Sequence, residues 1–347
     1  MNPKVSILVA TYNGEEYLHK QLDSIINQTH ENLEIIIQDD GSKDNTLKIL
    51  QGYAANDSRI RVSQNKSNLG IVKNFYDLIS KSEGKYIAIS DQDDIWETDK
   101  IEILLDNISD SSLIYTDSAL IKDDDSSWGT TLLEQLGHTP KSGRFLMNLL
   151  TENTISGHAC LFKAELKEVI LKSRDLECHQ SYMYDQLIGT IASFNDGVRY
   201  YDKPLTRHRI HASNNHNTFI SKDKSDKSDK SDKSDKSNQR MLDERQEARR
   251  KERRERTKAP FFQRKRERAR IKTERAHEKL VLLESMFNTY STKRKNVFRL
   301  EPNPTIKFNT CFFNRKLCKE LVAVGIDKTE AKQLSLGKLY YTFLQIF

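Results

Sequence analysis

The sequence predicts an α/β domain with a mainly parallel sheet, followed by a disordered repeat and a charged helical tail. Short apolar runs alternate with segments of helical periodicity over residues 1–120, a tandem Lys-Ser-Asp repeat fills residues 224–236, and Arg and Lys crowd residues 240–275. We therefore divide the chain into a domain over 1–220, a low-complexity linker over 221–238 and a charged helical C-terminal region over 239–347.

The individual elements follow from where apolar residues fall. A short apolar run between turn signals predicts a strand, and apolar residues three and four apart predict one face of a helix. The predicted strands cover residues 5–10, 33–37, 60–62 and 86–89. The predicted helices cover residues 16–27, 46–55, 71–80, 163–172 and 183–192. This alternation is typical of βαβ units, and residues 200–205 are predicted to be a short strand that leads into a basic loop.

Composition limits the surroundings in which the chain works. The Lys-Ser-Asp repeat has no apolar side chain to bury, so we expect a disordered, nearly charge-neutral tether. The four cysteines contain no CxxC pair, which gives no sign of a disulfide framework. No apolar stretch reaches the ~18 residues of a membrane-spanning helix. We expect a cytoplasmic protein whose basic residues could also rest on the inner face of the cell membrane.

Three polar clusters follow the first, second and fourth predicted strands. They are Thr11-Tyr12-Asn13, Asp39-Asp40 and Asp91-Gln92-Asp93-Asp94. The carboxyl ends of parallel strands meet at one edge of the sheet, and ligands bind there. A Walker lysine loop and a GxGxxG motif are both absent, so a glycine-rich cradle for phosphate is not predicted. Carboxylates can instead hold a diphosphate through Mg²⁺ or Mn²⁺. An ordinary Asp-rich turn is the alternative interpretation of residues 91–94.

These motifs resemble a known family. VSILVATYNGEEYL, IIIQDDGSKDNT, NLGIVKNF and SDQDDIW follow one another as in inverting family 2 glycosyltransferases of the GT-A fold. SDQDDIW, YDQLIG and RHRIHASNN resemble the bacterial rhamnosyltransferase-like branch, which builds surface polysaccharides. The resemblance covers residues 4–217. It implies a metal-dependent hexosyltransferase that uses a UDP- or dTDP-sugar, with dTDP-rhamnose as the first candidate, and a glycan or lipid-linked acceptor.

The resemblance also implies which residues surround the donor. These are Thr11, Tyr12, Asn13, Asp39, Lys73, Asp91, Gly157, Arg207 and His208. Asp39 would hydrogen-bond the base, Lys73 would lie near the nucleotide, and the segment around Gly157 would contact the donor sugar or the acceptor. Arg207 and His208 would belong to a flexible basic loop that closes over the diphosphate. The His-x2-His spacing in that loop lacks the HExxH or cysteine partners of a zinc site.

The metal and the catalytic base are assigned in the same way. Asp91 and Asp93 would form the DxD element for ribose and metal, and Asp94 would support or share the metal. Asp93 and Asp94 are thus the implied holders of Mn²⁺ or Mg²⁺, and which of the two is the direct ligand stays open. Asp185 would be the base that removes the acceptor proton in a single displacement. From the residues alone, Asp185 could equally be a carboxylate that stabilises a helix N-terminus.

Two other classes of function were weighed. A sugar nucleotidyltransferase normally has an N-terminal glycine-rich loop with Arg and Lys, which is missing here. A nucleic-acid- or membrane-binding protein would act through the basic helices predicted over 240–275. Glu residues interleave with Arg and Lys in that stretch, and aromatic residues for base stacking are nearly absent. Nucleic acid is therefore not an expected partner; a solvated helical arm is favoured, and membrane-surface contact comes next.

Overall fold

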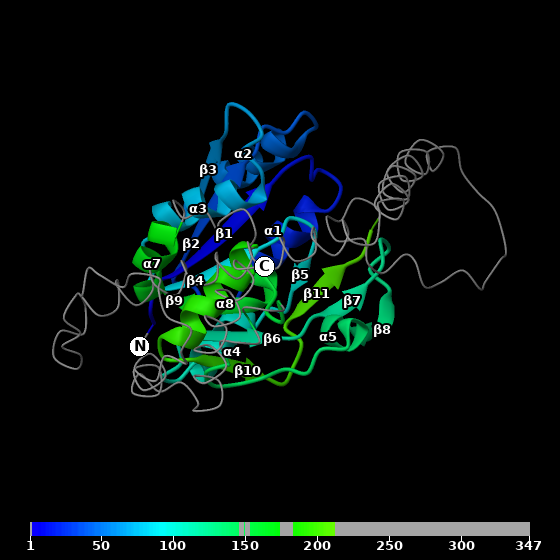
Figure 1. Cartoon of the computed structure of the whole chain (residues 1–347). Coiled ribbons are helices and arrows are strands. Elements are labelled where there is room, and N and C mark those ends of the chain that lie inside the picture. The colour runs from blue at the N-terminus through cyan, green and yellow to red at the C-terminus, as the bar shows by residue number, and fades with distance from the viewer. Residues whose placement is uncertain (1, 146–148, 150–152, 174–182, 212–347) are drawn as a thin grey trace, which may run out of the picture.

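The computed structural model describes residues 2–145, 149, 153–173 and 183–211. The predicted linker over 221–238 and the C-terminal region over 239–347 lie outside these residues, as does the predicted domain boundary at residue 220. Within the described part, the strands form two sheets (Figure 1). The larger sheet has the order β10 (Val198–Tyr201), β6 (Leu113–Thr116), β9 (Cys160–Lys163), β4 (Tyr86–Ser90), β1 (Val5–Thr11), β2 (Leu33–Asp39) and β3 (Ile60–Gln64).

The larger sheet is mainly parallel, which confirms the predicted fold class. β1 pairs in parallel with β2 on one side and with β4 on the other, and β2 pairs in parallel with β3. Only β9 of this sheet runs antiparallel, between β4 and β6. β1 and β2 are buried along almost their whole length, as their continuous apolar runs require of strands covered on both faces.

Helices pack on both faces of this sheet. One apolar cluster contains Leu8 and the helices α3 (Ile71–Lys81), α7 (Lys167–Ser173) and α8 (Tyr184–Phe194). The other contains Ile7 and Val9 with the helices α1 (Leu18–Ile26), α2 (Thr46–Asn56) and α4 (Lys100–Asn107). Successive residues of β1 thus point to opposite faces, which is the period of a pleated strand. None of the described helices is long and apolar enough to cross a membrane.

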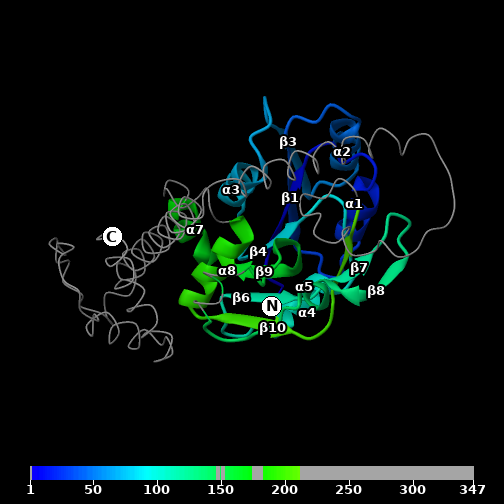
Figure 2. The same ribbon diagram turned by 45° about the vertical axis from the view of Figure 1, so that its right-hand side comes forward.

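The smaller sheet stands beside the larger one and shares the acidic loop with it. Its order is β5 (Ile95–Trp96), β11 (Thr206–Arg209), β7 (Ala119–Ile121) and β8 (Ser127–Thr131). Residues 91–94 connect the end of β4 directly to the start of β5, so this loop lies at the junction of the two sheets (Figures 1 and 2). Short helical segments complete the described part: α5 (Leu132–Leu136), η1 (Gly157–Ala159) and η2 (Ala164–Leu166).

The smaller sheet corrects one prediction. Arg207 and His208 do not lie in a flexible loop but in β11, which pairs with β5 on one side and β7 on the other. The predicted strand over 200–205 is replaced by two strands, β10 and β11, which flank Pro204. A proline cannot donate to a strand ladder, so it separates the two elements.

Gly84 lies between α3 and β4, where the backbone leaves no room for a side chain. A Cβ at Gly84 would lie 2.6 Å from the Ser6 nitrogen and 2.9 Å from the Lys4 carbonyl oxygen, both backbone atoms that cannot move aside alone. We expect Gly84→Ala to lower the free energy of unfolding by ~1–3 kcal/mol. Gly52 lies in α2 with nothing within 4 Å of such a Cβ, so Gly52→Ala should instead raise stability by ~0.5–1 kcal/mol. Urea unfolding followed by circular dichroism measures both, and effects of the same sign would contradict this packing.

Candidate active site

The first and second polar clusters meet at one edge of the larger sheet. The last residue of β1, Thr11, is paired with the last residue of β2, Asp39, and its hydroxyl donates to the Asp39 carboxylate at 3.3 Å. The third cluster joins them because β4 lies on the other side of β1, and the Tyr12 N–H donates to Gln92 Oε1 at 2.8 Å. The prediction that all three clusters share the carboxyl edge is confirmed.

Asp39, the predicted contact of the nucleobase, is fully buried, and both of its carboxylate oxygens accept hydrogen bonds within the protein. Its carboxylate accepts hydrogen bonds from the Thr11 hydroxyl, from the Ser42 N–H (3.0 Å) and hydroxyl, and from the Gln64 amide (3.0 Å). These bonds fix the turn after β2. A hydrogen bond from Asp39 to a nucleobase remains a prediction, and it would require one of these donors to be exchanged.

Asp40 holds the loop that leads to Lys73. Its two oxygens accept the backbone N–H groups of Leu69 and Gly70, each at 2.9 Å, directly before α3 begins. Gly70 has φ +85°, a conformation that side chains other than glycine rarely adopt. Lys73 follows on the first turn of α3 and is exposed to solvent. A cation at this end of the sheet is compatible with its predicted place near the nucleotide.

Tyr12 and Asn13 form the turn after β1. Tyr12 leaves 43% of its side chain exposed, so its ring offers a flat face at this edge. Asn13 has φ +48°, and its side-chain oxygen accepts the Lys43 N–H at 2.9 Å. Asparagine tolerates this left-handed conformation better than most residues, which explains why the chain can turn here without glycine.

Each of the three carboxylates in the acidic loop faces an imidazole. Their hydrogen bonds join Asp91 to His158 (3.2 Å), Asp93 to His211 (2.9 Å) and Asp94 to His208 (2.8 Å). The imidazoles come from η1, from β11 and from the residue two positions after β11. The hydrogen-bond partners of the loop therefore come from elements that lie far away along the chain.

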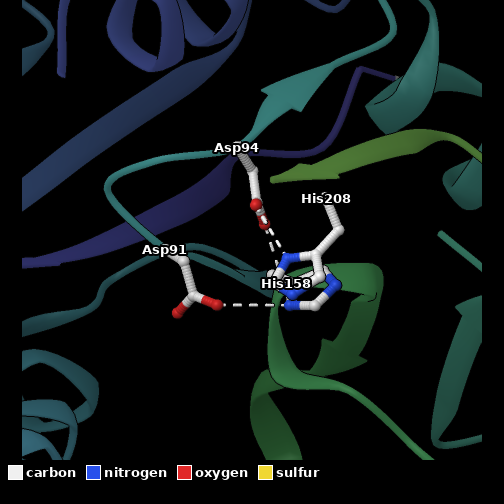
Figure 3. A group of neighbouring side chains, drawn as sticks. All are labelled: Asp91, Asp94, His158 and His208. Atoms are coloured by element: carbon white, nitrogen blue, oxygen red, sulfur yellow. Dashed lines mark hydrogen bonds and ion pairs between the residues drawn. The ribbon is translucent and has the colours of Figure 1, made fainter. Parts of the chain in front are cut away.

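Four of these side chains make a compact group of metal-ligand type (Figure 3). One ligand atom from each of Asp91, Asp94, His158 and His208 lies within 4.8 Å of the others. The His158 and His208 rings stack with centroids 4.5 Å apart. Asp94 is fully buried, and its Oδ2 accepts no hydrogen bond from the described residues. A buried carboxylate oxygen without a hydrogen-bond donor is free to ligate a cation, although His158 Nδ1 lies 3.8 Å away.

The donor set also bears on which ion fits. Two carboxylates and two imidazoles suit Mn²⁺ or Zn²⁺, whereas Mg²⁺ strongly prefers oxygen ligands. The sequence argument against zinc considered only the spacing around His208. The structure supplies a second imidazole, His158, from a distant segment, so that argument does not exclude zinc.

Burial and pairing shift the titration of this centre. Burial alone would raise the pKa of Asp94, but the facing His208 and His158 imidazoles hold it below its usual range. Burial opposes protonation of His208, yet the Asp94 carboxylate outweighs it and raises the His208 pKa to about 9. Burial raises the pKa of Asp93, with His211 opposing. At neutral pH Asp94 and His208 therefore form an ion pair in which the imidazole carries a proton. A metal that binds to His208 would have to displace this proton.

Asp93, predicted as a metal residue together with Asp94, lies apart from the four-residue group. Its carboxylate faces His211, whose ring packs on Tyr17 with centroids 5.0 Å apart. The Asp93 side chain is 15% exposed, whereas that of Asp94 is fully buried. Asp93 is therefore more accessible than Asp94 to a ligand at this edge, and Asp91, at 27%, is the most accessible of the three acids.

Of Arg207 and His208, which were predicted to contact the diphosphate, only His208 hydrogen-bonds to a carboxylate of the acidic loop. The Arg207 guanidinium instead lies 3.2 Å from the Glu97 carboxylate, and the side chain is 42% exposed. β11 holds Arg207 in a strand beside β5 rather than in a loop, and contact of its exposed side chain with a diphosphate remains a prediction.

Asp185, the predicted base, is the second residue of α8 and lies beside η1. Its carboxylate accepts the Gln186 N–H at 2.7 Å and a hydrogen bond from the Gly157 N–H. Burial raises the pKa of the Asp185 carboxyl, and the charge of Asp91 adds to this. A raised pKa makes the carboxylate a stronger proton acceptor. The bonds to backbone N–H groups also suit a helix N-terminal carboxylate, so the role as a base remains a prediction.

Gly157 is required by the protein's own packing. A Cβ there would lie 2.6 Å from the ring of Tyr184, which is buried and packs on Phe75 with centroids 4.2 Å apart. The predicted close approach at Gly157 is thus made by Tyr184, the residue before Asp185. A contact of this segment with the sugar or the acceptor remains a prediction.

Sequence reasoning missed the partners of the acids and one buried cation. Spacing does not pair His158 or His211 with a carboxylate, since these contacts join distant segments. No local pattern marks Lys100 either. It is fully buried, burial lowers its pKa to about 7, and its Nζ lies 3.6 Å from the centroid of the Trp96 ring.

The fold and the site together define an α/β domain that binds its ligand at the carboxyl edge of a parallel sheet, beside an acidic loop. Residues 6–171 match the model of the family described as Glycosyl transferase family 2. This part of the chain is therefore similar to family 2 glycosyltransferases.

Individual relatives agree with this family. An uncharacterized glycosyltransferase of Haemophilus influenzae is 45% identical over 100 residues, which are 29% of this chain and 31% of the relative. The putative glycosyltransferase EpsH of Bacillus subtilis is 33% identical over 217 residues, 61% of this chain and 62% of EpsH. The structure of S. aureus TarS 1-349 in complex with UDP is 22% identical, with a TM-score of 0.44 over 60% of this chain and 61% of that one. The chain spans less than two thirds of the length of each of these proteins.

The contact between Gly157 and Tyr184 predicts a non-additive pair of substitutions. Gly157→Ala should lower the free energy of unfolding by ~1–3 kcal/mol, because the new methyl group overlaps the buried ring. Tyr184→Leu removes the overlapping ring atoms at the cost of a cavity. In the double variant the penalty of the alanine should largely disappear, giving a coupling free energy of about 1 kcal/mol or more. Urea unfolding of the four proteins measures the coupling, and strictly additive effects would contradict the contact.

Proposed function

We propose that the chain is an inverting, metal-dependent glycosyltransferase that moves a hexose from a nucleotide-diphosphate sugar to a glycan or lipid-linked acceptor. The observation that carries this proposal is the meeting of the ends of β1, β2 and β4 with the acidic loop 91–94. The family 2 match over residues 6–171 supports sugar transfer as the reaction class. Asp185 lies beyond that match, so its role depends on the geometry and on the resemblance of YDQLIG.

The donor nucleotide would bind across the ends of β1 and β2. Thr11, Tyr12 and Asn13 would line its pocket, with Asp39 and Lys73 on the side of β2 and α3. The donor is proposed to be a UDP- or dTDP-sugar, with dTDP-rhamnose as the first candidate. A role in the synthesis of surface polysaccharide is supported by the resemblance of SDQDDIW and RHRIHASNN to the rhamnosyltransferase-like branch.

Mn²⁺ is the proposed ion, because the site mixes carboxylates with imidazoles and Mg²⁺ is less suited to such a set. Asp93 with His211 would hold it on the accessible side, and Asp91, Asp94 and His208 would hold or share it behind. When bound, a divalent ion neutralises the charge that develops on the diphosphate leaving group.

The chain's own residues would perform the proton transfer. The acceptor hydroxyl attacks the anomeric carbon as the bond from that carbon to the diphosphate breaks, and the Asp185 carboxylate takes the hydroxyl proton. Its place on α8, held by the Gly157 N–H and by packing of Tyr184, would give the carboxylate a fixed direction. One displacement inverts the anomeric configuration.

The proposed setting is the cytoplasmic side of the membrane, with peripheral contact through the basic residues 240–275. These residues, on which the alternative of a nucleic-acid- or membrane-binding protein also rests, lie outside the described part of the chain. That alternative therefore gains no structural support, and the enzyme remains the proposal.

The proposed metal predicts the behaviour of the acidic loop. Asp93→Asn should abolish turnover and weaken Mn²⁺-dependent donor binding, because it removes an accessible carboxylate. EDTA should abolish transfer by the wild type, and Mn²⁺ should restore it. Calorimetric titration with Mn²⁺ and a panel of nucleotide sugars measures both effects. The exposed Asp106 on α4 provides a matched control, since Asp106→Asn should behave as wild type. Full activity in EDTA would exclude the metal-dependent mechanism.

The proposed base predicts a separation of binding from chemistry. Asp185→Asn should leave donor affinity unchanged, because the donor contacts lie on other elements, while transfer falls by ~10²–10⁴-fold. Product analysis by NMR should show inverted configuration in the wild type. Retention would refute the single displacement. Near-normal transfer by Asp185→Asn would refute only the assignment, and Asp175 and Glu177, which lie outside the described residues, would be tested next.

A further inference from the structure

A buried lysine lies directly behind the acid–imidazole centre. Lys100 is the first residue of α4, is fully buried, and is not among the residues assigned to donor, metal or base. Its Nζ donates to the His158 carbonyl oxygen at 2.6 Å and to the Thr206 hydroxyl at 2.8 Å. Nζ also lies 3.6 Å from the centroid of the Trp96 ring. Burial of a lysine without a carboxylate partner is rare, so a specific task is expected of it.

These three contacts of Lys100 Nζ connect three different elements. His158 belongs to η1, Thr206 begins β11, and Trp96 lies in β5, directly opposite Thr206 in the strand pairing. Lys100 therefore bridges η1 and the start of β11, beside a longer direct bond from the Thr206 hydroxyl to the His158 carbonyl oxygen (3.4 Å). An ammonium and a neutral amine can both donate two hydrogen bonds, so this tie does not depend on the charge of Lys100.

The tie acts on the imidazoles that face the acidic loop. His158 carries the bonded carbonyl, and His208 lies two residues after Thr206 on the same short strand. The stacked arrangement of the two rings, and the approach of each to its carboxylate, depends on the distance between η1 and β11. Partners that orient metal ligands from behind typically change metal affinity by ~10–100-fold when they are removed.

We propose that Lys100 is a positioning residue of the metal site, which holds His158 and His208 in place for ion binding by bonding η1 to β11. This inference rests on the proposed metal-dependent function. It assigns no contact between Lys100 and the ion or the donor. Its effect should therefore appear in Mn²⁺ affinity beyond any loss of stability.

The experiment compares two buried or half-buried lysines in the full chain. Lys167 in α7 donates to the Ser82 carbonyl oxygen at 2.7 Å, and α7 lies on the opposite side of the molecule from β11 (Figure 1). Lys100→Met and Lys167→Met each replace an amine with an unbranched side chain that cannot donate. Both should lower the melting temperature. Only Lys100→Met should raise the dissociation constant for Mn²⁺, by ~10-fold or more. Electron paramagnetic resonance of free Mn²⁺ measures this constant.

Thr206 provides a second test if Lys100→Met does not fold. Thr206→Val removes the hydroxyl with little change of shape. It thereby removes both the bond from Lys100 and the direct bond to the His158 carbonyl oxygen, and it should weaken Mn²⁺ binding. Thr206→Ser keeps the hydroxyl and should match wild type. Unchanged Mn²⁺ affinity in folded Lys100→Met or in Thr206→Val would overturn the positioning role alone. If the wild type binds no Mn²⁺, the metal-dependent function is overturned together with this inference.

Discussion

Mutual repulsion of the carboxylates in the loop after β4 is the constraint on which the rest of the site depends. Asp91, Asp93 and Asp94 stand within four residues, and two like charges ~5 Å apart cost about 3 kcal/mol at an effective dielectric of ~20. The loop is tolerated because an imidazole faces each acid. These imidazoles come from η1 and from around β11, so the acids after β4 depend on both segments for their partners.

The same dependence explains the arrangement of the two sheets. The larger sheet needs only local apolar patterns to form its βαβ units, and it brings the ends of β1, β2 and β4 to one edge. The smaller sheet has little apolar surface of its own, with Leu120, Leu132 and Ile210 as its separate cluster. Trp96 of β5 packs in the core of the larger sheet, and polar contacts to the acidic loop hold β11, among them the bond from Arg209 Nε to the Asp93 carbonyl oxygen (3.0 Å). Site and fold therefore stabilise each other.

This difference also decides what the sequence could predict. The parallel core was predictable because β1, β2 and β4 are apolar runs next to amphipathic helices, and the polar clusters follow directly from where these strands end. β5 and β11 were not predictable, since they are only two and four residues long and the latter reads Thr-Arg-His-Arg. The pairing of His158 and His211 with acids depends on contacts across the whole domain. No local spacing encodes such contacts, and so the loop expected around Arg207 proved to be a strand.

Burial divides the acid–imidazole pairs into two kinds. Asp94 and His208 form an ion pair behind the loop, where the carboxylate sees no solvent and the raised pKa of His208 keeps the imidazole protonated near neutral pH. Asp93 and His211 are more accessible. A proton on the inner pair therefore compensates the acids when no ion is bound, and binding of an ion at these ligands would release it. Asp91 and Asp93 keep some exposed surface, whereas Asp94 has none. The proposed donor would therefore meet Asp91 and Asp93, while His208 compensates the buried charge of Asp94.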